Sequence, residues 1–164
     1  MPNWCANSVV FFAAEDRLGM IRDLFTDIQQ KQEVDGRYHL PDFAVSEGFM
    51  RDIVLEPGCI TFTTRSSPNI SLLAEIADHY DAAFVNRYME IGDGLYGEAR
   101  YDFYMLTITD LDQEELRAAI CYDPQKRDYP YGEQVFEYEG DLLDHILDQK
   151  IAQKSDTDIY QRLR

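Results

Sequence analysis

Residues 83–108 read AFVNRYMEIGDGLYGEARYDFYMLTI and hold two aromatic, apolar segments on either side of a glycine turn at residues 92–94. Ala83–Ile91 has the β-branched and aromatic composition typical of a strand, and Tyr96–Ile108 predicts a long partner strand. Glycine supplies the positive φ that a tight turn between antiparallel strands needs. These residues therefore predict an antiparallel sheet.

Strands and helices alternate in the residues that precede this stretch. Residues 7–13 (NSVVFFA) resemble a central strand, and residues 53–55 and 60–64 flank a Pro57-Gly58 turn signal, which predicts a hairpin. Two further segments carry apolar residues at helical spacing, and Ser67-Pro68 predicts the start of the second helix. The two apolar stripes are Leu18, Ile21, Leu24, Phe25 and Ile28, and Leu72, Leu73, Ile76, Ala77 and Tyr80.

The order strand, helix, strand, strand, helix, strand predicts an α+β fold of the ferredoxin-like type. In that fold two helices pack on one face of an antiparallel sheet. The segment at residues 96–108 follows the last of these strands, so we expect it to form an extra edge strand.

The C-terminal part is expected to be helical. Asp110 can cap a helix, residues 122–138 look irregular, and a last amphipathic helix ends in a polar tail that we expect to fray from Lys154. The apolar positions are Leu111, Leu116, Ala119 and Ile120 in the first helix, and Leu142, Leu143, Ile146, Leu147 and Ile151 in the last. We expect residues 1–164 to form one domain, with a ferredoxin-like core at 1–108, a helical extension at 109–153 and a tail at 154–164.

The charge balance is the most unusual property of the chain. Thirty-one acids against fifteen lysines and arginines give a formal net charge of −16, and the acids are spread along the whole sequence. Such a surface repels phosphate, so we expect no direct binding to nucleic acid or to an anionic membrane. The acidity either serves solubility alone, or has a function of its own, by attracting a basic partner or by imitating DNA phosphates.

The compartment follows from the cysteines and the N-terminus. The three cysteines (Cys5, Cys59 and Cys121) are far apart and show no metal-ligand spacing, which favours reduced thiols. Residues 1–12 lack a basic region followed by a long apolar region, so they do not resemble a signal peptide, and we find no membrane-spanning run. We expect a cytoplasmic protein without a cofactor.

Catalytic and metal motifs are not evident in the sequence. His39, His79 and His145 have no serine or cysteine partner in a nucleophilic motif. Four acids near the glycine turn could hold a hard cation, but their spacing does not match a calcium loop. Gly92, Gly94 and Gly97 are followed by a strand and not by the helix that a phosphate loop needs. We therefore assign no catalytic residue and no metal site.

Two blocks of sequence carry a family resemblance. The opening MPNWCANSVVFF, with Pro2, Asn3, Trp4, Cys5 and Asn7, is similar to the start of the YubB ferredoxin-like domain proteins, which are phage- and plasmid-borne. The second block resembles that family at its proline helix start (Pro68) and at its glycine hairpin (Tyr88, Glu90, Gly92, Gly94 and Gly97). It departs from the family at Ile91, where a proline is common. The resemblance implies a ferredoxin-like fold and a mobile-element origin, and no established reaction.

These observations predict a non-enzymatic accessory protein of a mobile genetic element that binds a basic host or defence protein, as an inhibitor or a nucleic-acid mimic. The expected contact residues are acids near the glycine turn and at a helix start: Glu90, Asp93, Glu98, Asp102, Asp112, Glu114 and Glu115. The alternatives are a small enzyme with carboxylates in a cleft, and a structural or self-assembling subunit with an apolar patch or a paired sheet edge. The oligomeric state is left open.

Overall fold

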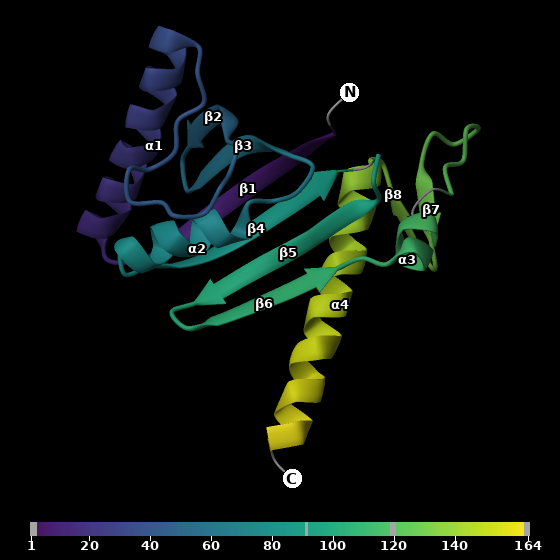
Figure 1. Ribbon diagram of the computed structural model, residues 1–164. Helices are drawn as coiled ribbons and strands as arrows, with labels where there is room; N and C mark the ends of the chain where they lie inside the picture. Colours follow the sequence, from purple (N-terminus) through teal and green to yellow (C-terminus); the bar gives the residue numbers. More distant parts are fainter. Residues whose placement is uncertain (1–2, 91, 119–120, 163–164) are drawn as a thin grey trace.

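A computed structural model describes residues 3–90, 92–118 and 121–162. Its principal feature is a six-stranded antiparallel sheet with helices on both faces (Figure 1). The strands of this sheet are β1 (Trp4–Phe12), β2 (Arg51–Glu56), β3 (Cys59–Arg65), β4 (Ala83–Glu90), β5 (Leu95–Asp102) and β6 (Met105–Asp110). The helices are α1 (Glu15–Asp35), α2 (Ile70–His79), α3 (Gln113–Ala118) and α4 (Glu139–Arg162).

The sheet has the ferredoxin-like topology that the sequence predicts. Its strand order is β2-β3-β1-β4-β5-β6, and all the pairings are antiparallel. The first four of these strands, together with α1 and α2, form the βαββαβ unit, and β5 and β6 extend the sheet beyond β4. The Pro57-Gly58 hairpin is confirmed, because Glu56 pairs with Cys59 and Gly58 has a φ of 86°.

The main hydrophobic core lies between the sheet and the two helices α1 and α2, on what we call the first face. Phe25 of α1 packs against Phe11 and Phe62 of the sheet, with ring centroids 6.2 Å apart in both pairs. Ile76 of α2 is fully buried in the same core. This core confirms the prediction that two helices cover one face of the sheet.

On the second face, α4 packs over β5 and β6 and forms a smaller core. Leu142 and Leu147 of α4 are fully buried there, and they pack in one cluster with the buried residues Tyr96 of β5 and Leu111, which follows β6. Figure 1 shows α4 crossing the sheet at this end and continuing past the edge strand β6. The second face over β1, β3 and β4 carries none of the described helices.

The single long strand predicted at residues 96–108 is wrong. The chain turns at Phe103-Tyr104, so this segment forms the two paired strands β5 and β6, with Asp102 opposite Met105. Phe103 adopts a φ of 51°, which glycine or asparagine usually provides. Because two aromatic residues occupy the turn, the sequence carries no turn signal at this point. The extension therefore contains two strands, where one edge strand was expected.

The helices also differ from their predicted bounds. α1 continues to Asp35, past Ile28, the last position of its predicted apolar stripe. It ends at Gly36, which has a φ of 67° and donates its N–H to the Gln32 carbonyl at 2.9 Å. α2 begins at Ile70, after an Asn69 N-cap, so the helix start predicted at Ser67-Pro68 is two residues too early.

In the C-terminal part, Asp112 and not Asp110 caps α3, and the predicted helical positions Ala119 and Ile120 lie outside the described residues. The segment expected to be irregular contains a small hairpin, β7 (Tyr129–Tyr131) and β8 (Gln134–Phe136). α4 is helical to Arg162, beyond Lys154, where we expected the frayed tail to begin.

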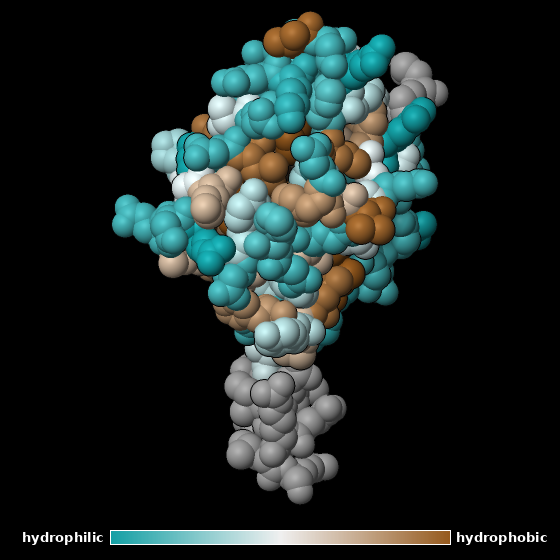
Figure 2. All heavy atoms as spheres, turned by 60° about the vertical axis from the view of Figure 1, so that its left-hand side comes forward, coloured by the Kyte–Doolittle hydropathy of each residue, from teal (hydrophilic) through white to brown (hydrophobic). Residues whose placement is uncertain are grey.

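Figure 2 brings forward the side of the molecule that is on the left in Figure 1, and shows hydrophobic residues in separate groups among hydrophilic ones. Among the described helices, none has both the length and the apolar character that a membrane crossing requires.

Candidate functional site

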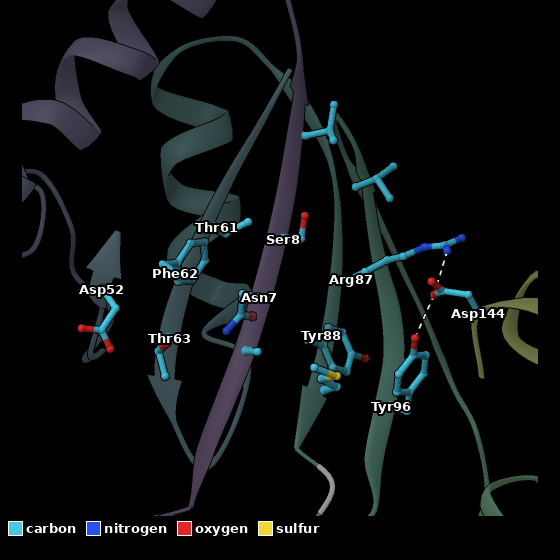
Figure 3. A pocket seen from close by; sticks show the side chains of 14 residues that line it. Asn7, Ser8, Asp52, Thr61, Phe62, Thr63, Arg87, Tyr88, Tyr96 and Asp144 are labelled. Atoms are coloured by element: carbon cyan, nitrogen blue, oxygen red, sulfur yellow. Dashed lines mark hydrogen bonds and ion pairs between the residues drawn. The ribbon is translucent and has the colours of Figure 1, made fainter. Parts of the chain in front are cut away.

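A groove lies on the second face, where α4 leaves β1, β3 and β4 uncovered (Figure 3). Its volume is about 580 Å³. Because side chains alternate along each strand, every second residue of these strands points into it. The uncharged residues of the floor are Ala6, Ser8 and Val10 of β1, Thr61 and Thr63 of β3, and Val85 and Met89 of β4.

The wall of the groove beside α4 is built around Arg87. Its guanidinium donates to the Glu98 carboxylate on β5 at 3.1 Å, to the Asp144 carboxylate on α4 at 3.0 Å, and to the Asp148 carboxylate one helical turn further on. Figure 3 shows Arg87 and the Tyr96 hydroxyl converging on Asp144 from β4 and β5. This Tyr96–Asp144 hydrogen bond measures 2.8 Å.

The environment keeps these groups in fixed protonation states. Partial burial lowers the pKa of the Arg87 guanidinium, but the hydrogen bonds to Asp148 and Glu98 outweigh it, so the pKa is raised overall. Burial, followed by the hydrogen bond to Asp144, raises the pKa of the Tyr96 hydroxyl. Arg87 therefore stays cationic and Tyr96 stays neutral at physiological pH.

The charge of the groove is negative in sum. The Arg87 guanidinium faces the three carboxylates of Glu98, Asp144 and Asp148, and on the opposite rim Asp52 pairs with Arg51 at 2.9 Å. Glu98 is almost fully buried, and Arg100 donates to it as well, at 3.1 Å. Such a groove suits a cationic group that carries an apolar part, because the floor is uncharged and the walls are acidic.

The acids predicted to surround the glycine turn are dispersed in the structure. Glu90 and Glu98 are both buried, so neither presents a free carboxylate at the surface. Glu90 accepts the backbone N–H groups of Gly92, at 3.0 Å, and of Asp93. Asp93 is exposed at the turn, whereas Asp102 is exposed at the opposite end of β5.

The acids predicted at the helix start mostly serve that helix. Asp112 accepts the N–H groups of Glu114 and Glu115 at 2.9 Å, and Glu115 accepts the N–H of Asp112 at 2.7 Å. This reciprocal arrangement is a capping box. Lys150 of α4 donates to Glu115 at 2.6 Å, so the cap also joins α3 to α4. Asp112 and Glu114 are exposed, and Glu115 is half-buried.

The glycine hairpin of the family motif has a structural explanation. Tyr88 lies opposite Gly97, and its hydroxyl donates to Asp110 of β6 at 2.6 Å. A Cβ at Gly97 would come within 2.9 Å of the Tyr88 hydroxyl oxygen and still closer to Asp110. Gly94 has a φ of 68° and lies against Gln113 of α3. These glycines allow the close approach of the hairpin, Tyr88 and α3.

The N-terminal motif forms part of β1 and its surroundings. Pro2 lies outside the described residues, and the Asn3 carbonyl accepts the N–H of Ser66 at 2.8 Å. The Trp4 ring lies 3.4 Å from the Arg51 guanidinium carbon and 5.4 Å from the Phe49 ring, an arrangement that allows a cation–π contact. Pro68 is buried.

Buried polar groups connect β1 to its neighbours within the first-face core. The amide nitrogen of Asn7 donates to the Thr64 hydroxyl at 2.9 Å, and that of Asn86 donates to Asn7 at 3.0 Å. Cys5 is completely buried beside them, and burial raises the pKa of its thiol to about 11. Asn7 and Cys5 thus have structural roles in the described contacts.

The histidines lie apart from one another and from the groove. His39 bonds to Asp35, His79 stacks on Phe43 with centroids 3.8 Å apart, and His145 bonds to Gln149. Within residues 3–90, 92–118 and 121–162, no group of three or more histidine, cysteine or acidic side chains could hold a metal ion.

Sequence reasoning identified Glu98 but missed the other residues of the groove wall. Arg87 and Tyr96 sit in segments predicted as strands, but nothing in the sequence places α4 against them. Asp144 and Asp148 are four residues apart and share a helix face, which is the one signal that could have drawn attention to them.

The comparisons with known proteins agree with the fold. Residues 49–129 match the model of a family described as the ferredoxin-like domain in Api92-like protein. The matched segment spans β2 to β6, together with α2 and α3, and its description does not use the YubB name. No curated protein and no solved structure shows significant similarity to the chain.

Proposed function

We propose that this chain is an acidic accessory protein that binds a basic host or defence protein in the cytoplasm, and that the groove on the second face makes the contact. The observation that carries the proposal is the contrast between an uncharged floor and a wall in which the carboxylates of Glu98, Asp144 and Asp148 outnumber the guanidinium groups of Arg87 and Arg100. The resemblance of the N-terminal motif to the YubB family supports a phage or plasmid origin. A nucleic-acid mimic or inhibitor is the form of binding that this charge favours.

Charge and shape support a partner that brings both a cation and an apolar group. The net charge of −16 attracts a basic surface over a long range and accelerates the encounter. Within the groove, Val10, Val85 and Met89 offer apolar contacts, and Asp144 and Asp52 lie on opposite sides. A lysine- or arginine-containing segment with an adjacent apolar side chain fits this combination.

An enzymatic role has less support from the geometry. The charged groups of the groove wall bind one another, so Arg87 already has three acidic partners. Among the residues that the structure describes, hydrogen bonds to neighbouring backbone or hydroxyl groups lower the pKa values of the Asp35, Glu75 and Asp112 carboxyl groups. General acid catalysis near neutral pH requires the opposite shift.

The test is capture of partners from a bacterial lysate with the immobilised protein, at about 0.05 M and about 0.5 M salt. The test variant is Ala6→Arg, which places a cation in the middle of the groove at an exposed position of β1. The control is Val45→Arg, an exposed loop residue with the same change in charge. The captured protein is then purified, and its affinity for each variant is measured by calorimetry.

We expect one basic protein to be retained at low salt by the wild type and by Val45→Arg, and to bind Ala6→Arg at least about tenfold more weakly, because like charges in the groove oppose binding. Equal affinity for all three proteins would exclude the groove as the contact. If no basic protein is retained in a salt-dependent way, the acidity serves solubility alone.

A further inference from the structure

The two edges of the sheet differ in how they are protected against pairing. The edge strand β2 carries the charged residues Arg51, Asp52 and Glu56, and its register shifts between Arg51 and Val54. Charges and irregular pairing of this kind protect an edge from other strands. The opposite edge strand, β6, has no charged residue in its first five positions, Met105–Thr109, and its pairing with β5 is regular.

The backbone of β6 exposes hydrogen-bonding groups at alternate residues. Leu111 donates its N–H to the Tyr96 carbonyl at 2.9 Å, and the residues two and four positions earlier therefore also bond to β5. The N–H and C=O groups of Leu106 and Ile108 consequently point away from the sheet. In agreement, the Ile108 carbonyl accepts a hydrogen bond from the Lys154 side chain at 2.9 Å.

The side chains at this edge are apolar and accessible. Met105, Leu106 and Ile108 are 57%, 44% and 41% exposed, and Tyr104 in the adjacent turn is 98% exposed. A regular edge strand with exposed apolar side chains is a template for pairing with another strand. In this chain it stands out because the rest of the molecule is strongly acidic.

We propose that β6 pairs in antiparallel fashion with β6 of a second copy, around a two-fold axis at Thr107. In this register Leu106 of each copy lies opposite Ile108 of the other, and these residues exchange the outward hydrogen bonds of their backbones. The Ile108 carbonyl has two lone pairs, so it can accept the Leu106 N–H in addition to the Lys154 ammonium. Their side chains lie on the same face of the sheet and form two apolar cross-strand pairs. The strand is therefore complementary to itself, as a symmetric interface requires.

Charge favours a second copy at this edge over a basic partner. The residues that would meet, Met105–Thr109, are uncharged, so they offer no attraction to a cation and no repulsion to a copy. α4 extends past β6 on the second face (Figure 1). Because a two-fold axis perpendicular to the sheet keeps that face on the same side in both copies, both α4 helices lie on the second face of the joined sheet, whereas Leu106 and Ile108 meet on the first face.

The first test is sedimentation of the full chain over a range of salt and protein concentrations. We expect a species of twice the 19.1 kDa chain mass, and we expect it to become more stable as salt increases, because salt screens the repulsion between two acidic copies. The proposed partner complex has the opposite salt dependence, so the two proposals can fail separately. A chain that remains monomeric at all salt concentrations would overturn the dimer.

The second test removes the self-complementarity. Leu106→Lys places a charge on the edge, and Val135→Lys makes the same change at an exposed strand residue of the small hairpin. We expect Leu106→Lys to raise the dissociation constant at least about tenfold and Val135→Lys to leave it near that of the wild type. Equal dissociation constants for the two variants would contradict pairing through β6.

A cross-link checks the register. In a background with Cys59 and Cys121 changed to serine, Thr107→Cys brings two cysteines directly opposite each other across the axis, within reach of a disulfide. Met105→Cys is the control, because its two copies would lie about 14 Å apart along the strands. We expect a rapid disulfide-linked dimer for Thr107→Cys only. Equal cross-linking of both variants would contradict the proposed register.

Discussion

The two faces of the sheet are covered in different ways. On the first face, α1 and α2 bury large apolar side chains such as Phe25, Phe84 and Ile76. On the second face, α4 covers only the β5–β6 end, and its contacts combine a small apolar cluster with the ion pairs of Arg87. The difference shows how the molecule can have a stable core and still leave half of one sheet face open.

The first face mainly stabilises the fold, whereas the second face carries the candidate binding site. Hydrophobic burial is not directional, so a full apolar layer mainly stabilises the fold. Ion pairs have defined geometry but contribute less to stability when they are partly exposed. α4 docks only on the β5–β6 end of the second face, which leaves the groove open. The ion pairs of Arg87 with Asp144 and Asp148 in this docking also place charged groups on the wall of the groove.

The largest effect is expected from the first-face core. Phe25→Ala should lower the free energy of unfolding by about 3–5 kcal/mol, because it removes a fully buried ring and leaves a cavity. Leu147→Ala, a fully buried position on the second face, should cost about 2–3 kcal/mol, since its cluster is smaller and can collapse. Urea denaturation monitored by circular dichroism measures both. A larger loss for Leu147→Ala would reverse the comparison.

An intermediate effect is expected at the ion pairs of the second face. Arg87→Met should cost about 2–3 kcal/mol, because it removes one of the two arginines that neutralise the buried Glu98 carboxylate. Arg100→Met is the matched control, since Arg100 also contacts Glu98 at 3.1 Å but has a side chain that is 58% exposed. Arg100→Met should lower the free energy of unfolding by less than about 1 kcal/mol. Similar losses in urea denaturation would show that the wall has no special role.

The smallest effect concerns alkaline pH and the first-face core. Burial raises the pKa of the Cys5 thiol to about 11 from its ordinary 9.0. The unfolded chain therefore loses this proton first, and stability falls as pH rises above about 9. The titration of Cys5 should lower the free energy of unfolding by about 1 kcal/mol between pH 8 and pH 10.

Other groups titrate in this range as well, so the quantity to measure is the difference in the free energy of unfolding between the wild type and Cys5→Ala. A difference between the wild type and Cys5→Ala that does not change with pH would contradict the argument.

Much of the ferredoxin-like unit could be predicted because its signals are local. Apolar residues at helical spacing place the buried face of α1 and α2, and Pro57-Gly58 marks the β2–β3 turn. The sequence gives no turn signal where a residue adopts a backbone conformation that is rare for its type. Phe103 turns the chain with a positive φ, so β5 and β6 were predicted as one strand. The direct continuation of α1 to Asp35 was missed because apolar periodicity ends before the helix does.

The candidate site was only partly predictable, because composition does not tell which acids face solvent. Glu90 and Glu98 look like surface acids in the sequence, but a turn and two arginines bury them. Asp112 and Glu115 look like a contact surface, but they cap α3. The groove depends on where α4 docks, and that docking depends on contacts between residues more than fifty positions apart, such as Arg87 and Asp144.

The sequence by itself determined the overall charge, the α+β class and the order of the elements in the ferredoxin-like unit, because these follow from composition and from patterns within single elements. Only the tertiary structure decided which face stays open, which acids remain exposed and which edge is unprotected. These properties depend on the relative placement of distant segments, above all of α4 and β6. Packing between elements, and not local propensity, sets that placement.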